Sequence, residues 1–158
     1  MNSADNPISN RTSGENAENQ LPASGSLTLN VDDGPLAIAE FQDQLNDLCS
    51  RSGYDESARF AVRLAIEEAL VNAFRHGNGN RPGSHVTVDY SVTPEKITVQ
   101  VTDEGEGFDP GKVPDPTEDE RLGLPTGRGI LIMRAFMTDV SFNKKGNTVT
   151  LVYKNPAE

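Results

Sequence analysis

Three polar side chains recur at helical spacing in the middle of the chain: Glu68, Asn72 and His76. Because residues four apart lie on the same side of an α-helix, we expect a carboxylate, a carboxamide and an imidazole to follow one another along that side. The carboxamide oxygen of Asn72 suits a hard cation such as Mg²⁺ that is shared with phosphate oxygens. Glu68, one turn earlier, is placed to orient or deprotonate a nucleophile that attacks a phosphate. The alternative is a row of solvated or capping residues.

A glycine-rich turn forms the second candidate. Asp103 closes a predicted strand, and its carboxylate can accept a hydrogen bond from the amino group of a purine. Gly105 and Gly107 follow at alternate positions, where glycine allows positive φ angles and a close approach of the backbone to a flat ligand. The alternative is an ordinary glycine turn after a strand.

The third candidate is the start of an apolar helix at Gly127-Arg128-Gly129. Free amides at a helix N-terminus and the helix dipole bind phosphate oxygens, and glycines let the anion come close. The guanidinium of Arg128 can add a charge-assisted contact. The alternative is a loop exit with a surface arginine.

A long helix from about Asp55 to His76 must carry the first of these groups. Val62, Ile66 and Ala69 share one apolar face at helical spacing, which indicates packing on a core. Phe60, Leu64 and Val71 make a second apolar row, so we expect the helix to be covered on both sides. Gly77 stands in the position of a C-terminal cap. Glu67 lies 100° round the helix from Glu68 and receives a structural role.

The remaining elements complete an α+β domain. Alternation predicts strands at 26–31, 86–92, 97–101, 140–142 and 149–153, and apolar periodicity predicts helices at about 36–52 and 129–137. We expect a two-layer α/β sandwich, with a mostly antiparallel mixed sheet and helices on one face. Residues 1–24 read as a disordered tail, 25–155 as one domain, and 109–125 as a long functional or mobile loop.

Composition narrows the classes of function. The chain has 158 residues and a formal net charge of −10, which argues against a nucleic-acid binder and fits a basic partner. The single cysteine, Cys49, excludes an intramolecular disulfide and reads as a small buried hydrophobe. There is no apolar run of membrane-spanning length and no signal peptide, so we expect no membrane partner and a cytoplasmic location.

Taken together, the three candidate segments resemble a known superfamily. The run EEALVNAFRHGN resembles the N box of the GHKL ATPases, whose ATP-binding domain is the Bergerat fold. DEGEGF and GRGILIM resemble the first and second glycine boxes of these proteins. Asn147-Thr148 is similar to the Gly-Thr element that closes such domains, although Asn147 replaces the glycine. The chain looks most like the single-domain anti-sigma-factor serine/threonine kinases of this histidine-kinase-like ATPase family.

This resemblance implies a role for each candidate residue. Glu68 would be the catalytic base and Asn72 the magnesium ligand. Asp103 would accept the adenine amino group, with Thr148 nearby. The other ATP-binding positions implied are in the glycine boxes and at the end of the N box: His76, Gly105, Gly107, Gly127, Arg128 and Gly129. Residues 109–126 would form a lid over ATP.

The resemblance also implies partners and leaves alternatives open. Such kinases sequester a sigma factor, phosphorylate an anti-anti-sigma protein of the STAS type, and are usually homodimers. One alternative is a nucleotide-binding regulator without phosphotransfer, and another is the catalytic domain of a sensor histidine kinase. The last is an α+β domain without a ligand.

Overall fold

Five strands with alternating apolar residues form one sheet. In this computed structural model, which describes residues 20–107 and 127–156, the sheet order is β1-β2-β3-β5-β4 and every pairing is antiparallel. The strand bounds are β1 Ser24–Asn30, β2 His85–Val92, β3 Lys96–Thr102, β4 Asp139–Phe142 and β5 Thr148–Lys154. The expected disordered tail (residues 1–24) falls mainly outside the described residues, and the lid (109–126) falls wholly outside them.

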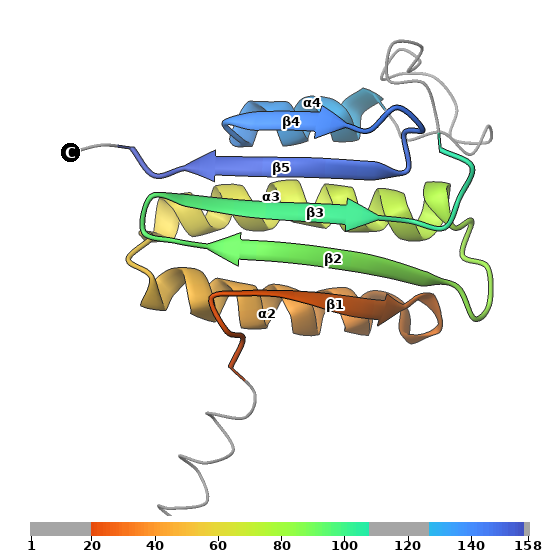
Figure 1. Cartoon of the computed structure of the whole chain (residues 1–158), viewed down its shortest axis with the longest axis horizontal. Helices are drawn as coiled ribbons and strands as arrows, with labels where there is room; N and C mark the ends of the chain where they lie inside the picture. The colour runs from red at the N-terminus through yellow and green to blue at the C-terminus, as the bar shows by residue number, and fades with distance from the viewer. Residues whose placement is uncertain (1–19, 108–126, 157–158) are drawn as a thin grey trace, which may run out of the picture.

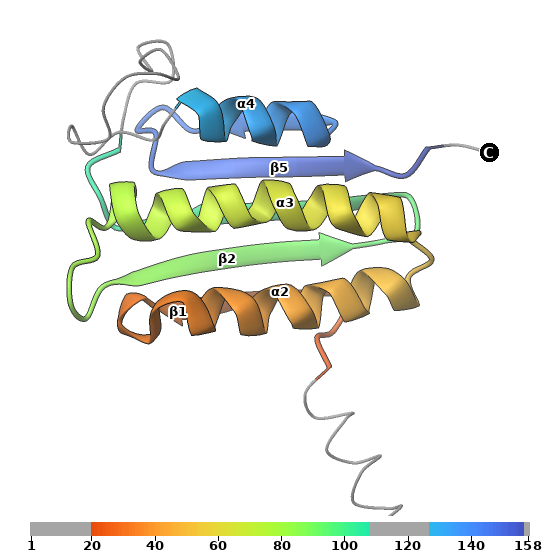
Figure 2. The ribbon, with the colours of Figure 1, turned by 180° about the vertical axis from the view of Figure 1, so that it is seen from behind.

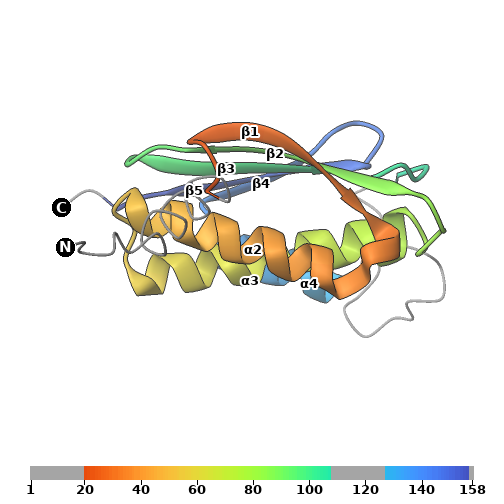
Figure 3. The same cartoon turned by 90° about the horizontal axis from the view of Figure 1, so that it is seen from below.

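The helices cover one face of this sheet. After a short 3₁₀ turn, η1 (Val31–Asp33), the chain forms α2 (Gly34–Arg51) and α3 (Glu56–Asn72), and later α4 (Gly127–Phe136). Figure 3 shows the three helices in a layer beneath the sheet, and Figure 2 shows α3 between α2 and α4. The predicted α+β sandwich is therefore confirmed, and the sheet is wholly antiparallel rather than mixed.

The core lies between the two layers. The sheet contributes the buried side chains Val86, Val88, Val99, Val101 and Leu151, and the helices contribute Phe41, Leu45, Ile66, Leu70 and Met133. Burial raises the pKa of the Cys49 thiol to about 11, which fits its predicted place as a small buried hydrophobe. No helix in the described part of the chain is long and apolar enough to cross a bilayer.

The central helix begins as expected and is covered differently from our prediction. Asp55 is its N-cap, and its Oδ1 accepts a hydrogen bond from the Ala58 amide at 2.8 Å. The predicted core face is buried, but Phe60 from the second apolar row is 63% exposed. The preceding helix α2 packs against α3 as expected, but the second apolar row is covered only in part, since Leu64 and Val71 are half-buried and Phe60 is not covered.

Asp103 and the chain segment that follows β5 lie at opposite ends of the sheet. Asp103 follows the last residue of β3, whereas Lys154 at the end of β5 pairs with Lys96 at the start of β3. Beyond Lys154, the Asn155 amide donates to the Glu95 carbonyl at 2.8 Å and its side chain donates to the Pro94 carbonyl at 3.1 Å. Figure 1 shows the chain leaving β5 at the end opposite to the one reached by the end of β3.

Candidate functional site

Asn72 lies at the last residue of α3 with an unpartnered side-chain amide. Its Nδ2 is buried and has no hydrogen-bond partner among the described residues. Leaving such a group unpaired costs about 1–3 kcal/mol, so the amide is available to a ligand on the described part of the chain. A half-turn of the carboxamide exchanges its nitrogen and oxygen, so it can donate to a phosphate oxygen or present its oxygen to a cation. Asn72 therefore fits the phosphate and magnesium site that the sequence suggested.

Glu68 lies one turn before Asn72 and is half-buried. Burial raises the pKa of its carboxyl group, the positive charge of Arg128 on α4 opposes this shift, and the neighbouring Glu67 adds to it. A carboxylate with a raised pKa is a better proton acceptor than one in water. Glu67 itself is exposed, in agreement with the structural role predicted for it.

The helix does not end as the sequence suggested. Residues Ala73–Gly77 form a π-helical turn, η2, and the Asn78 amide donates to the Ala73 carbonyl at 2.9 Å. The φ angle of Gly77 is not positive, so Gly77 is not the left-handed cap that we expected. Glu68 and Asn72 lie one α-helical turn apart on one side, and the half-buried His76 follows within the π turn. Single π turns of this kind are frequent at functional sites.

Asp103 is held where β3 ends, against the end of η2. Its Oδ1 accepts a hydrogen bond from the Gly105 amide at 2.8 Å, and its own amide donates to the Asn147 carbonyl at 2.9 Å. A Cβ atom at Gly77 would overlap the Asp103 carboxylate, and one at Gly105 would overlap the Gly77 carbonyl. Two residues without side chains therefore let the Asp103 turn touch the end of the helix that carries Glu68 and Asn72.

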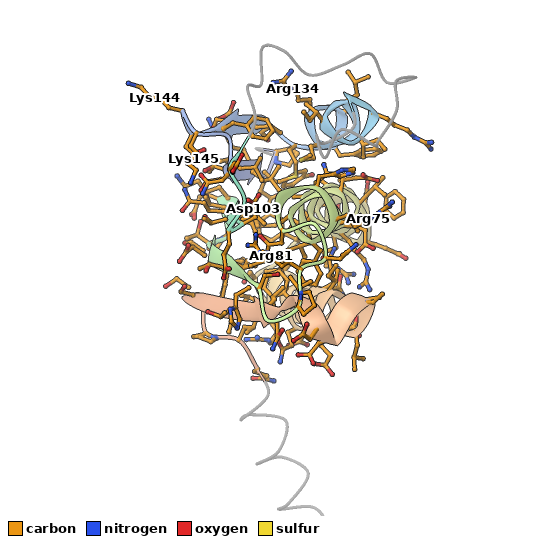
Figure 4. The ribbon with its side chains drawn as sticks, turned by 90° about the vertical axis from the view of Figure 1, so that its right-hand side faces the viewer. Arg75, Arg81, Asp103, Arg134, Lys144 and Lys145 are labelled. Carbon is orange, nitrogen blue, oxygen red and sulfur yellow. The ribbon has the colours of Figure 1, made fainter. Side chains whose placement is uncertain are left out.

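The surroundings of Asp103 raise the pKa of its carboxyl group. Burial raises its pKa, while the hydrogen bond from Gly105 and the charge of Lys145 lower it. Figure 4 looks onto this end of the molecule and shows Asp103 between the strands and α3, with Lys145 on the sheet side. A half-buried carboxylate here gains from a hydrogen-bond donor, as the amino group of a purine would supply.

Two more of the predicted residues lie beside Asp103. Thr148 pairs with Thr102 across β3 and β5, and the two hydroxyl oxygens are 3.0 Å apart. Gly107 has a φ of 82°, and a Cβ there would overlap the Lys145 carbonyl. The structure thus brings Asp103, Gly105, Gly107 and Thr148 together, as the sequence suggested.

The predicted helix start at 127–129 is also confirmed, since α4 begins at Gly127. Arg128 is exposed and Gly129 is buried in the first turn. Because α4 packs against α3, the charge of Arg128 reaches Glu68, as its effect on the pKa of Glu68 shows. This places the candidate phosphate-binding turn beside the candidate base.

A separate hollow of about 650 Å³ lies between α2 and α3. Its apolar lining comes from Ile38, Phe60, Leu64, Val71 and Phe74. None of Glu68, Asn72 or Asp103 lines it, so it is a different feature from the candidate site.

The sequence assigned no definite role to one neighbouring side chain, that of Asn78. Asn78 is only 3% exposed, accepts a hydrogen bond from the Glu104 amide in the turn that carries Asp103, and donates one to the His85 carbonyl at the start of β2. The run GNGN indicated only where the helix stops, because the burial of Asn78 depends on partners that lie farther along the chain.

Comparison with known proteins agrees with this arrangement. A family model described as the histidine kinase-like ATPase domain matches residues 32–153, a range that includes every candidate residue. The chain is similar to the serine-protein kinase RsbW of Listeria innocua, at 27% identity over 123 residues, which are 72% of this chain and 76% of that protein. It is also similar to the anti-sigma F factor of Clostridium botulinum, at 30% identity over 98 residues, which are 59% of this chain and 68% of that protein.

Proposed function

The chain belongs to the family of histidine kinase-like ATPase domains, and we propose that it is an ATP-dependent protein serine/threonine kinase that also acts as an anti-sigma factor. The observation that carries the proposal is the unpartnered amide of Asn72 one helical turn from the half-buried Glu68. The names of the relatives, serine-protein kinase and anti-sigma F factor, support the same reading.

The adenine end of the site would be formed by the turn after β3. Asp103 would accept a hydrogen bond from the adenine amino group, with Thr148 close by. Gly105 and Gly107 would give the base a surface free of side chains. The proposal is supported by the contact of Asp103 with Gly77 and Gly105, because a rigidly held carboxylate can discriminate between bases.

The phosphate end would be formed by the first turn of α4 and the end of α3. The amides of Gly127 and Gly129, with the guanidinium of Arg128, would bind phosphate oxygens. Asn72 would coordinate magnesium, which when bound would neutralise charge on the phosphates, and His76 would lie at the edge of this region.

Glu68 would act as the general base. It would take the proton of the acceptor hydroxyl while that oxygen bonds to the terminal phosphorus, and the bond to the departing diphosphate oxygen would break to leave ADP. Burial raises the pKa of Glu68, which makes the carboxylate a better proton acceptor, and the charge of Arg128 opposes this rise.

The protein partners would be a sigma factor and an anti-anti-sigma protein of the STAS type, the latter being the phosphoacceptor. A net charge of −10 suits a partner as basic as a DNA-binding sigma factor. We propose that the protein works as a homodimer in the cytoplasm, where it regulates transcription without touching nucleic acid itself.

The second candidate is an ATP-binding regulator of the same fold without phosphotransfer. In that case ATP would only order a surface for the sigma factor. The position of Glu68 beside Asn72 favours the kinase, because a regulator needs no proton acceptor there.

Replacement of Glu68 separates the two functions. Glu68→Gln should retain ATP binding in calorimetry and lower transfer of labelled γ-phosphate to a purified STAS-domain protein by about 10²–10⁴-fold. Glu67→Gln, at the exposed neighbouring position, is the matched control and should transfer phosphate normally. Unchanged transfer in Glu68→Gln would refute the base. A protein that binds ATP but transfers nothing to any STAS partner would favour the regulator.

A further inference from the structure

Asn78 is a buried polar residue, and both the nitrogen and the oxygen of its carboxamide form hydrogen bonds. Its Nδ2 donates to the His85 carbonyl at 2.8 Å, and its Oδ1 accepts from the Glu104 amide at 2.7 Å. Its backbone amide donates to Ala73 at 2.9 Å, and its carbonyl accepts from Arg81 at 3.0 Å. With only 3% exposure, the side chain has little access to water that could replace these partners.

These bonds join three segments that are distant in sequence. Asn78 itself follows the π turn that ends the central helix, His85 begins β2, and Glu104 lies in the turn after β3. Glu104 stands between Asp103 and Gly105, the residue whose amide holds the Asp103 carboxylate. The position of the Glu104 amide therefore sets where the Asp103 carboxylate can point.

A second contact holds the same turn from the outside. The Glu104 carboxylate accepts a hydrogen bond from the His85 amide at 3.0 Å and lies 3.3 Å from His85 Nδ1. This carboxylate is about half exposed, so water competes with its contacts. The shorter, partly buried bond from the Glu104 amide to Asn78 is thus the stronger restraint on the Asp103 turn.

We propose that Asn78 is a positioning residue that sets the selectivity of the site for adenine. It holds the turn so that the Asp103 carboxylate faces the exocyclic amino group of the base. The proposal rests on the proposed function, because it takes Asp103 to be the group that reads adenine. Asparagine is suited to this task, since one side chain must donate to a carbonyl and accept from an amide.

A positioning role and a merely structural role for Asn78 predict different changes in base selectivity. A loss of general stability would weaken binding of every nucleotide by the same factor. A loss of Asp103 positioning would weaken ATP binding more than ITP binding, because ITP carries a carbonyl oxygen in place of the amino group and offers no exocyclic amino donor to Asp103. The ratio of ATP affinity to ITP affinity is therefore the decisive measurement.

The experiment compares the full chain with Asn78→Ala and Asn78→Asp by calorimetry with ATP, ITP and ADP. We expect Asn78→Ala to lower the ATP-to-ITP affinity ratio by about fivefold or more, with the ATP-to-ADP ratio unchanged because the phosphate end is intact. Asn78→Asp keeps the acceptor for the Glu104 amide and should retain more of the ATP-to-ITP ratio. The control is Asn155→Ala, which removes a bond to the Pro94 carbonyl at the opposite end of the sheet and should change neither ratio.

Two results would overturn the inference. One is an equal loss of ATP and ITP affinity in Asn78→Ala, and the other is the same ATP-to-ITP ratio in Asn78→Ala and Asn78→Asp. Thermal melts without nucleotide identify any variant that fails to fold, and Asn78→Asp then carries the comparison with the unaltered chain. If the unaltered chain binds no ATP, the proposed function itself fails. Normal ATP selectivity in the unaltered chain and in Asn78→Ala removes only the role of Asn78.

Discussion

The backbone of Gly77 passes so close to the Asp103 carboxylate that any side chain at position 77 would overlap it. This contact joins the end of the central helix to the end of β3, and both halves of the candidate site meet there. The absence of a Cβ atom at Gly77 is therefore a requirement of the site rather than of the helix end, since its φ is not positive.

Gly77→Ala tests this contact. Alanine in a helical turn usually gains about 1 kcal/mol over glycine, but here its methyl group must displace Asp103. We expect ATP affinity to fall by about tenfold or more in calorimetry, without the usual gain in thermal stability. In a double-mutant cycle with Asp103→Ala the two losses should be less than additive, because removal of the carboxylate relieves part of the overlap. Fully additive losses would contradict the contact.

Asp103→Asn should separate stability from binding. Because burial raises the pKa of Asp103, the folded state keeps its proton to higher pH than the unfolded chain does. The stability that protonated Asp103 contributes to the folded state is therefore present below the ordinary pKa of an aspartate. It is lost as the pH rises through the raised pKa of Asp103 in the folded state. The Asp103→Asn variant does not titrate, so it keeps this stability as the pH rises. Its side-chain oxygen can still accept the hydrogen bond from the Gly105 amide. At pH 7 its melting temperature without nucleotide should equal or exceed that of the unaltered chain, and this difference should vanish at acid pH.

The same variant should lose ATP binding, because the amide nitrogen of asparagine can face the adenine amino group as a second donor. The control is Asp139→Asn at the exposed start of β4, which should leave ATP binding unchanged. Tight ATP binding by Asp103→Asn would contradict the adenine role of Asp103.

Arg128→Ala should shift the pH profile of phosphotransfer. The positive charge of Arg128 lowers the pKa of Glu68, so its removal lets that pKa rise further. Since the base must be ionised, the acid limb of kcat against pH should move to higher pH. Saturating ATP is used because Arg128 is also a proposed phosphate ligand. Arg134→Ala, on the same helix, is the control and should leave the limb in place. An unmoved acid limb in Arg128→Ala would count against Glu68 as the titrating base.

Asn72→Leu should maintain or raise the stability of the folded protein and abolish its stabilisation by ATP and magnesium. Leucine removes a buried amide that has no partner among the described residues, and replacement of an unsatisfied group by an apolar one of similar size is neutral or stabilising. We expect an equal or higher melting temperature without ligand, and no added stabilisation by ATP and magnesium. Asn46→Leu is the contrasting variant, because Asn46 accepts a hydrogen bond from Arg59 at 3.3 Å and its loss should lower stability. Full stabilisation of Asn72→Leu by ATP and magnesium would contradict the metal role.

Much of this arrangement follows from the sequence because its signals are local. Alternation of Val86, Val88, Val99 and Val101 with polar residues gave the strands, and the N-cap Asp55 marked the start of α3. The glycine boxes pointed to the turn of Asp103, Gly105 and Gly107, whose close contacts the structure shows, since close approach of the backbone leaves a clear pattern of glycines.

The errors arose where distant residues decide the outcome. The GNGN run looked like a capped helix end, but the chain forms a π turn because Asn78 is drawn inward by His85 and Glu104. Phe60 was assigned to a covered row, yet whether neighbouring helices cross above it depends on helix packing that periodicity does not contain.

The attachment of Asn155 beside Pro94 and Glu95 has a practical consequence. It fixes the exit of β5 a full strand length away from Asp103, at the other edge of the molecule. A fluorophore or affinity handle joined beyond Asn155 would therefore report on or immobilise the protein without crowding nucleotide entry, so surface-based binding assays should be built from that side.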